Sequence, residues 1–147
     1  MDILSKLPDR LQELMIQQDI KASHLAEEIG VEPSTVTRYL RGERLPSFGC
    51  FVKLLDRFNC SADFLMGLIE YPPEGVEYRT PTCFSVRFRE LLQEYKMSQY
   101  ALHQKTNLSY DNFNKWLKGE ASPFLDNLIK LAKAFDCSVD YLIGRVL

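Results

Sequence analysis

The side chains best suited to chemistry in this chain are short hydroxyls and arginines that recur at helical spacing. Ser34 and Thr37 carry hydroxyls that can meet base edges or phosphates, and Arg38 offers a two-pronged fork that fits guanine O6 and N7. Arg41 and Arg44 follow at three-residue intervals and concentrate positive charge beside that fork. This pattern indicates a contact with nucleic acid, although cations near the end of a helix also satisfy the helix dipole.

A helix must position these side chains, and the apolar spacing around them predicts one. Pro33 suits the first position of a helix, where the missing N–H has no intrahelical partner anyway. Val36, Tyr39 and Leu40 form the stripe that is expected to be buried, and Gly42 ends the helix. The hydroxyls and the arginine fork then fall on the opposite, solvent-facing side.

The chain contains its own copy, which predicts its domain organisation. Residues 10–67 align with residues 87–144 without a gap, and sixteen of the 58 aligned positions are identical. Such a repeat predicts two similar domains, at 1–69 and 83–147. The connector at 70–82 holds three prolines and a glycine, which block continuation of a helix. Apolar spacing is helical throughout and no segment alternates with period two, so an all-α chain is predicted.

Local signals mark where several of these helices begin and end. Gly30 is expected to end the second helix in the left-handed conformation, and Asn107 takes its place in the second unit. Ser61 and Ser98 are expected to cap the helices that follow them, and Thr82 to cap the first helix of the second unit. Five short helices therefore fit each unit.

The first unit resembles the helix-turn-helix of the lambda repressor and Cro-type family in the stretch LAEEIGVEPSTVTRYLRGERLPS, residues 25–47. The resemblance extends through FNCSADFLMG at 58–67, and the second unit is a more divergent match in LHQKTNLSYDNFNKWLKGEASP and FDCSVDYLIG. It implies two tandem five-helix lambda-repressor-like DNA-binding domains joined by a proline-rich linker. It also implies that the third helix of a unit lies in the major groove of double-stranded DNA, while the helix before it anchors to phosphate.

Carried onto this sequence, the resemblance implies DNA contacts in both units. In the first unit they are Ser34, Thr35, Thr37, Arg38, Arg41 and Arg44, and in the second unit Gln99, Tyr110, Asn112, Asn114, Lys115 and Lys118. Asn114 can pair with adenine, and Lys115 with guanine or phosphate. Gln99 matches a family position that often binds a backbone phosphate.

Two residues of the second unit depart from this pattern. Asp111 places a carboxylate near phosphates, which is repulsive unless it accepts from a cytosine amino group. His103 stands where the first unit has Ala26, at the close approach of two helices, so altered packing is expected there. The second unit is therefore either a second DNA reader or a pairing or positioning domain.

Composition argues against several other classes of protein. The net charge is −2, with −3 in residues 1–70 and +1 in residues 71–147, so DNA binding must rest on local patches. The four cysteines form no C-x-x-C pair and no histidine stands at ligand spacing from them, so no metal site is expected. No phosphate-binding glycine loop or catalytic pattern occurs, so we expect neither an enzyme nor a cofactor. No apolar run spans a bilayer and no signal peptide is evident, which favours the cytoplasm.

These observations lead us to expect a repressor-like transcriptional regulator of prokaryotic or phage type. Relatives of the family usually pair two copies on half-sites about 34 Å apart, and the 13-residue connector reaches ~43 Å when extended. Because the two reading surfaces differ, the chain is expected to act as a pseudo-dimer on an asymmetric operator. The alternative is a protein-interaction or dimerisation module, in which the divergent second unit no longer reads DNA. On that view one or both units use the surface of the third helix, or the connector with Tyr71 and Tyr78, to hold a partner protein or a second copy of the chain.

Overall fold

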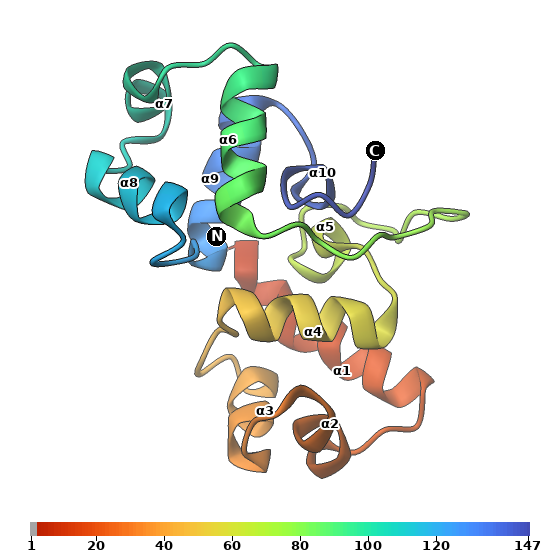
Figure 1. The fold of residues 1–147 in the computed structure, drawn as a ribbon. Coiled ribbons are helices and arrows are strands. Elements are labelled where there is room, and N and C mark those ends of the chain that lie inside the picture. Colours follow the sequence, from red (N-terminus) through yellow and green to blue (C-terminus); the bar gives the residue numbers. More distant parts are fainter. Residues whose placement is uncertain (1–2) are drawn as a thin grey trace. The chain divides into compact units, whose positions relative to one another are not determined.

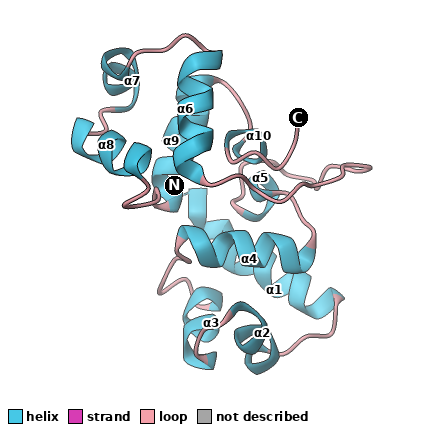
Figure 2. Ribbon diagram, viewed as in Figure 1, coloured by secondary structure: helices cyan, strands magenta, loops and turns pink. Residues whose placement is uncertain are grey.

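The computed structural model of the protein describes residues 3–147, and every regular element in that range is a helix, as predicted (Figure 2). The chain divides into two compact units, residues 1–76 and residues 77–147. Figure 1 labels the α-helices along the chain.

The first unit consists of a short 3₁₀ helix and the helices α1 to α5. Their bounds are η1 Ile3–Lys6, α1 Leu7–Gln17, α2 Ala22–Ile29, α3 Pro33–Leu40, α4 Phe48–Phe58 and α5 Ala62–Leu65. The helix α3 packs on both α1 and α2, and α2 also contacts α4. Val36 and Tyr39 are buried beneath α3 as predicted, whereas Leu40 is only half-buried because it lies at the rim of that stripe.

The second unit repeats this order with an aromatic core. Its helices are α6 Phe84–Glu94, α7 Gln99–Thr106, α8 Tyr110–Lys118, α9 Leu125–Phe135 and α10 Val139–Leu142. Phe88 of α6 lies with its ring centroid 5.9 Å from that of Phe113 and 5.7 Å from that of Trp116, both on α8. Aromatic pairs at these distances add stability beyond the area that they bury. This cluster fixes α8 against α6.

Most of the predicted helix ends are confirmed. Gly30 ends α2 with φ 76°, and Asn107 ends α7 with φ 59°, the left-handed region that both residues tolerate. The hydroxyls of Ser61 and Ser98 accept backbone N–H bonds in the first turns of α5 and α7. The prediction for Thr82 was wrong, because α6 begins one residue later than assumed and Cys83 occupies the cap position without a side-chain cap bond.

An arginine at the same repeat position in each unit, Arg10 or Arg87, binds the last helix of that unit. Arg10 donates to the carbonyl oxygen of Phe64, and its guanidinium lies 4.2 Å from the centre of that ring. Arg87 donates to the carbonyl oxygen of Tyr141 at 2.7 Å, and its guanidinium lies 4.7 Å from the Tyr141 ring. The same residue at the same repeat position therefore joins the first helix of each unit to the last by a hydrogen bond and a cation–π contact.

Candidate nucleic-acid interface

The outward face of α3 presents the short polar side chains that the sequence singled out. Ser34 and Arg38 are exposed on this face, while Val36 and Tyr39 are buried on the other. Thr37 is half-buried and donates its hydroxyl to the carbonyl oxygen of Pro33 at 3.2 Å. Its oxygen can then act toward an external group only as an acceptor.

Three arginines border this face, and none of them forms an ion pair with another described residue. Arg38 lies in the last turn of α3, Arg41 is its C-terminal cap residue, and Arg44 follows in the loop before α4. All three are exposed, and within residues 3–147 no ion pair engages any of them. Each guanidinium is therefore available to an anion in solution, and the helix dipole alone offers weak compensation.

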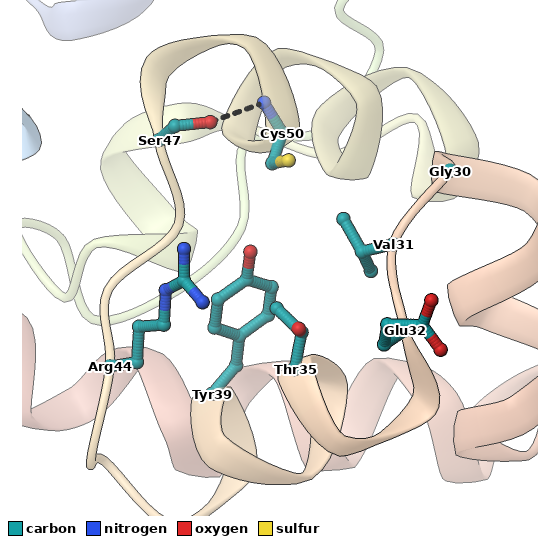
Figure 3. A pocket seen from close by; sticks show the side chains of 8 residues that line it. All are labelled: Gly30, Val31, Glu32, Thr35, Tyr39, Arg44, Ser47 and Cys50. Atoms are coloured by element: carbon teal, nitrogen blue, oxygen red, sulfur yellow. Dashed lines mark hydrogen bonds between the residues drawn. The ribbon is translucent and has the colours of Figure 1, made fainter.

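Thr35 lies on the flank of α3 rather than on its outward face. Together with Tyr39 it lines an open hollow of about 450 Å³ between α3 and the start of α4 (Figure 3). The other lining residues are Gly30, Val31, Glu32, Arg44, Ser47 and Cys50. In Figure 3 the guanidinium of Arg44 stands beside the Tyr39 ring, so this arginine borders both the hollow and the exposed face of the loop.

The phenol of Tyr39 remains a neutral donor in this position. The side chain is 2% exposed, and burial, aided by the Cys50 thiol, raises the pKa of Tyr39 to about 12 against a countering effect of Arg44. Removing a charged phenolate from water is unfavourable, which is why the protonated form is favoured. The flank of α3 is thus polar but carries no extra negative charge from Tyr39.

The helix α2 is held in place by a charged cluster behind it. Arg57 of α4 donates to the carboxylate of Glu28 and, at 2.6 Å, to the side-chain oxygen of Gln18. His24 lies 3.1 Å from Glu28 on the same helix, and Lys53 reaches the carbonyl oxygen of Ile29 at 3.4 Å. Glu28 is therefore compensated within the unit, and its charge is directed at α4 instead of at α3.

The second unit places a stacked aromatic pair where α7 meets α8. His103 stacks on Tyr110 with 4.8 Å between ring centroids, and its Nδ1 lies 2.6 Å from the carbonyl oxygen of Leu108. Whereas α2 packs closely along α3, α7 meets α8 over a shorter stretch and packs mainly on α9. An imidazole in place of the methyl group of Ala26 accounts for this difference, because the larger side chain occupies the space between the helices.

The remaining predicted contacts of the second unit differ in their accessibility. Asn114 and Lys118 are exposed on α8, whereas Asn112 and Gln99 are half-buried. Lys115 is exposed, but its Nζ lies 3.1 Å from Oδ2 of Asp111, one helical turn earlier. The spacing of four residues signals this pair in the sequence, whereas nothing in the sequence signals the stacking of His103 on Tyr110.

Metal and membrane signals are absent from the part of the chain that the structure describes. No cluster of three or more histidine, cysteine, aspartate or glutamate side chains that could hold a metal ion occurs in residues 3–147. No helix in the same range is long and apolar enough to cross a bilayer.

Comparison with known protein families matches each unit separately. Residues 11–65 match the family model described as helix-turn-helix, and residues 87–146 match the model of the Cro/C1-type HTH DNA-binding domain. Both matches enclose the helix pairs described above, α2 with α3 and α7 with α8.

Three curated bacterial proteins are similar to part of the chain. The uncharacterized HTH-type transcriptional regulator YvzC of Bacillus subtilis is 41% identical over 51 residues, which cover 35% of this chain and 66% of the relative. The similarly named RP766 of Rickettsia prowazekii is 33% identical over 60 residues, covering 38% of this chain and 65% of the relative. YobD of Bacillus subtilis is 31% identical over 58 residues, covering 40% of this chain and 52% of the relative. The matches thus span less than two thirds of each relative, and no solved structure matches.

Proposed function

Since this chain carries two tandem helix-turn-helix domains of the Cro/C1 type, we propose that it is a sequence-specific regulator of transcription that binds double-stranded DNA. It acts as a repressor-like pseudo-dimer, in which the two units serve as two DNA-binding heads and bind the two unlike halves of one operator. The operator DNA lies in the cytoplasm of a prokaryotic cell. We expect no catalytic residue and no cofactor in this regulator. The names of the three relatives, all HTH-type transcriptional regulators, support the general class.

The observation that carries the proposal is the uncompensated positive charge beside the outward face of α3. Arg38, Arg41 and Arg44 are exposed and free of ion pairs within the described chain. A net charge of −2 gives the whole protein no attraction for DNA, so binding must come from a local patch of this kind. In the family geometry this helix enters the major groove.

The three arginines have different roles in the proposed complex. Arg38, on the helix itself, reads a guanine edge through two parallel hydrogen bonds, and Ser34 contacts a neighbouring base or phosphate. Arg41 and Arg44, beyond the end of the helix, neutralise backbone phosphates and release the counterions bound there. Phosphate contacts fix the position of the head, and base contacts select the sequence.

The second head reads a different half-site because its surface differs. At the positions of Ser34 and Arg38 it has Asp111 and Lys115, and this pair is already joined by a salt bridge. On DNA, Lys115 exchanges the carboxylate of Asp111 for a phosphate or a guanine. Joining both heads in one chain raises the effective concentration of the second, so modest affinity of each head suffices.

The test is selection of bound sequences from a random DNA pool with the full chain, followed by separate replacement of each half of the selected operator. We expect affinity to fall on replacement of either half, and to fall steeply with salt because phosphates are neutralised. Failure to enrich any sequence would contradict the proposed function. If affinity falls only when the half bound by the first unit is replaced, the second unit takes no part in recognition of the operator.

A second candidate function concerns the second unit alone, as a protein-interaction or dimerisation module. Tyr100 and Phe124 are exposed at the repeat positions where the first unit has Ser23 and Ser47. Exposed aromatic side chains are typical of protein contacts. In that case Tyr100→Ser and Phe124→Ser would reduce self-association, measured by sedimentation, without changing affinity for DNA. Arg38→Ala would instead reduce affinity for DNA without changing self-association.

A further inference from the structure

The connection between the two units is tied down at its first end. Arg10 donates from Nη1 to the carbonyl oxygen of Ile69 at 2.6 Å and from Nη2 to that of Glu70 at 3.4 Å. The same guanidinium lies over the Phe64 ring of α5. The backbone of the first unit is therefore held as far as Glu70, the first residue of the connector predicted from the sequence.

The other end of the connector lies along the second unit. The backbone N–H of Arg79 donates to the carbonyl oxygen of Arg145 at 2.8 Å, and the Arg145 guanidinium lies 4.3 Å from the centre of the Tyr78 ring. Thr82 packs so closely against the backbone of Gly144 that a methyl group added there would lie 3.4 Å from its hydroxyl oxygen. We call residues 78–82 the linker strap.

Arg145, which holds the strap, is itself fixed. Its Nη1 lies 2.6 Å from Oδ1 of Asp140, and the two side chains are only 3% and 7% exposed. A buried pair of this kind does not open readily, because each charge would lose its partner away from water. The first unit has Leu68 at the corresponding repeat position, so this anchor belongs to the second unit alone.

We propose that the linker strap sets the spacing of the two half-sites on DNA, with Tyr78 and Arg145 as the residues that determine this specificity. The inference rests on the proposed function, two heads that bind one operator. With both ends held, only residues 71–77 are free, and the Cα atoms of Glu70 and Tyr78 can separate by at most ~26 Å. The 13-residue connector inferred from the sequence would have reached ~43 Å.

The free segment is also stiff. Pro72 and Pro73 restrict its first half, and Gly75 has φ 69°, which turns the chain instead of extending it. Each base pair inserted between half-sites shifts the second by about 3.4 Å and turns it by about 35° around the duplex, given 10–10.5 base pairs per turn. A short, stiff tether cannot span such a displacement, so one of the two heads must leave its half-site.

The experiment compares the full chain with Tyr78→Ala, which removes the ring on Arg145 but leaves the Arg145–Asp140 pair intact. Tyr71→Ala is the matched control, because Tyr71 is 75% exposed in the free segment. Affinity is measured for the selected operator and for versions with one or two base pairs inserted between its halves.

We expect the unaltered chain and Tyr71→Ala to lose about tenfold or more in affinity for one inserted base pair, as the effective concentration of the second head falls. Releasing the strap lengthens the free tether to Thr82, a reach of ~40 Å. Tyr78→Ala should therefore lose less than about threefold on the same insertion, and roughly twofold on the parent operator. An unchanged spacing preference in Tyr78→Ala would overturn the inference.

Hydrogen exchange tests the strap without DNA. The Arg79 amide should exchange slowly in the unaltered chain and about tenfold or more faster in Tyr78→Ala, since its bond to Arg145 then opens freely. Exchange of the Arg79 amide as fast as that of Glu77 in the unaltered chain would show that no strap exists. Absence of any selected operator, with Arg79 protected, would instead refute the proposed function and with it this use of the strap.

Discussion

His103 stacks on Tyr110 across the turn between α7 and α8, with an interplanar angle of 28°. Because His103 replaces the Ala26 of the first unit, the second unit has exchanged close helix packing for an aromatic contact. Tyr110 lies at the first position of α8 and also meets Phe113 edge-on at 6.1 Å. The start of α8 is therefore held by these ring contacts together with the cap bond that Asn112 N–H donates to the Ser109 hydroxyl, whereas α3 begins at Pro33 without a side-chain cap bond.

His103→Ala should lower the free energy of unfolding of the second unit by about 1–2 kcal/mol, from a lost hydrogen bond and a lost ring contact. Urea unfolding followed by Trp116 fluorescence measures this, since the chain has one tryptophan and it lies in this unit. Gln104→Ala, an exposed neighbour on α7, is the control and should change stability by less than about 0.5 kcal/mol. Equal stability of the two variants would show that the stack contributes nothing.

Arg38→Ala and Arg41→Ala should weaken DNA binding in different ways. Arg38→Ala should cost about 1–3 kcal/mol on the selected operator and little on random DNA, because a base contact is lost. Arg41→Ala should weaken binding to all sequences and reduce the slope of log affinity against log salt by about one. Salt titrations on both DNAs measure this.

The control for these arginines is Lys133→Ala, which removes an exposed charge from the last turn of α9. It should leave both the affinity for the operator and the salt slope unchanged. If it weakens binding as much as Arg41→Ala does, the effect of Arg41 is one of overall charge and not of contact with the duplex.

Asp111→Asn should strengthen binding to the downstream half-site by removing a carboxylate near the phosphates and releasing Lys115. Both side chains are exposed, so the salt bridge contributes only about 0.3–0.5 kcal/mol and the fold should be retained. Titration of an operator with its upstream half held constant measures the gain. A tenfold loss would mean instead that Asp111 accepts from a base, and no change would place the start of α8 away from DNA.

Tyr39 should make the first unit sensitive to alkaline pH. Its pKa is about 12 in the folded protein against 10.0 for the free phenol, so the folded state keeps a proton that the unfolded state loses. This contribution is complete below pH 10 and is lost as pH rises through 12, at about 1.4 kcal/mol for each pH unit between those values. Urea unfolding followed by circular dichroism should therefore show a steeper fall above pH 10 in the unaltered chain than in Tyr39→Phe.

Tyr71→Phe serves as the control for this pH dependence because its phenol is exposed. Its stability should follow that of the unaltered chain across the whole range. If the stability of Tyr39→Phe falls above pH 10 as steeply as that of the unaltered chain, groups other than the Tyr39 phenol cause the alkaline loss of stability.

Features that depend on a few neighbouring residues could be predicted from the sequence. The gapless repeat and the helical spacing of apolar residues indicated two all-α units. The cap at Ser98 involves a bond to Ala101 only three residues away, and the left-handed residues Gly30 and Asn107 follow from backbone preference. The exposed face of α3 followed from the same periodicity, because a helix separates its buried stripe from its exposed side.

Tertiary structure alone decided which of these side chains are free and how long the tether is. Arg10 reaches Glu70 across sixty positions of sequence, and Arg145 holds Arg79 across sixty-six. No local preference encodes such pairs, since they form only when packing of the core brings distant backbone together. The same holds for His103 and Tyr110, whose stacking depends on how far apart α7 and α8 settle. Periodicity shows which face of a helix is buried, and packing determines what the other face can reach.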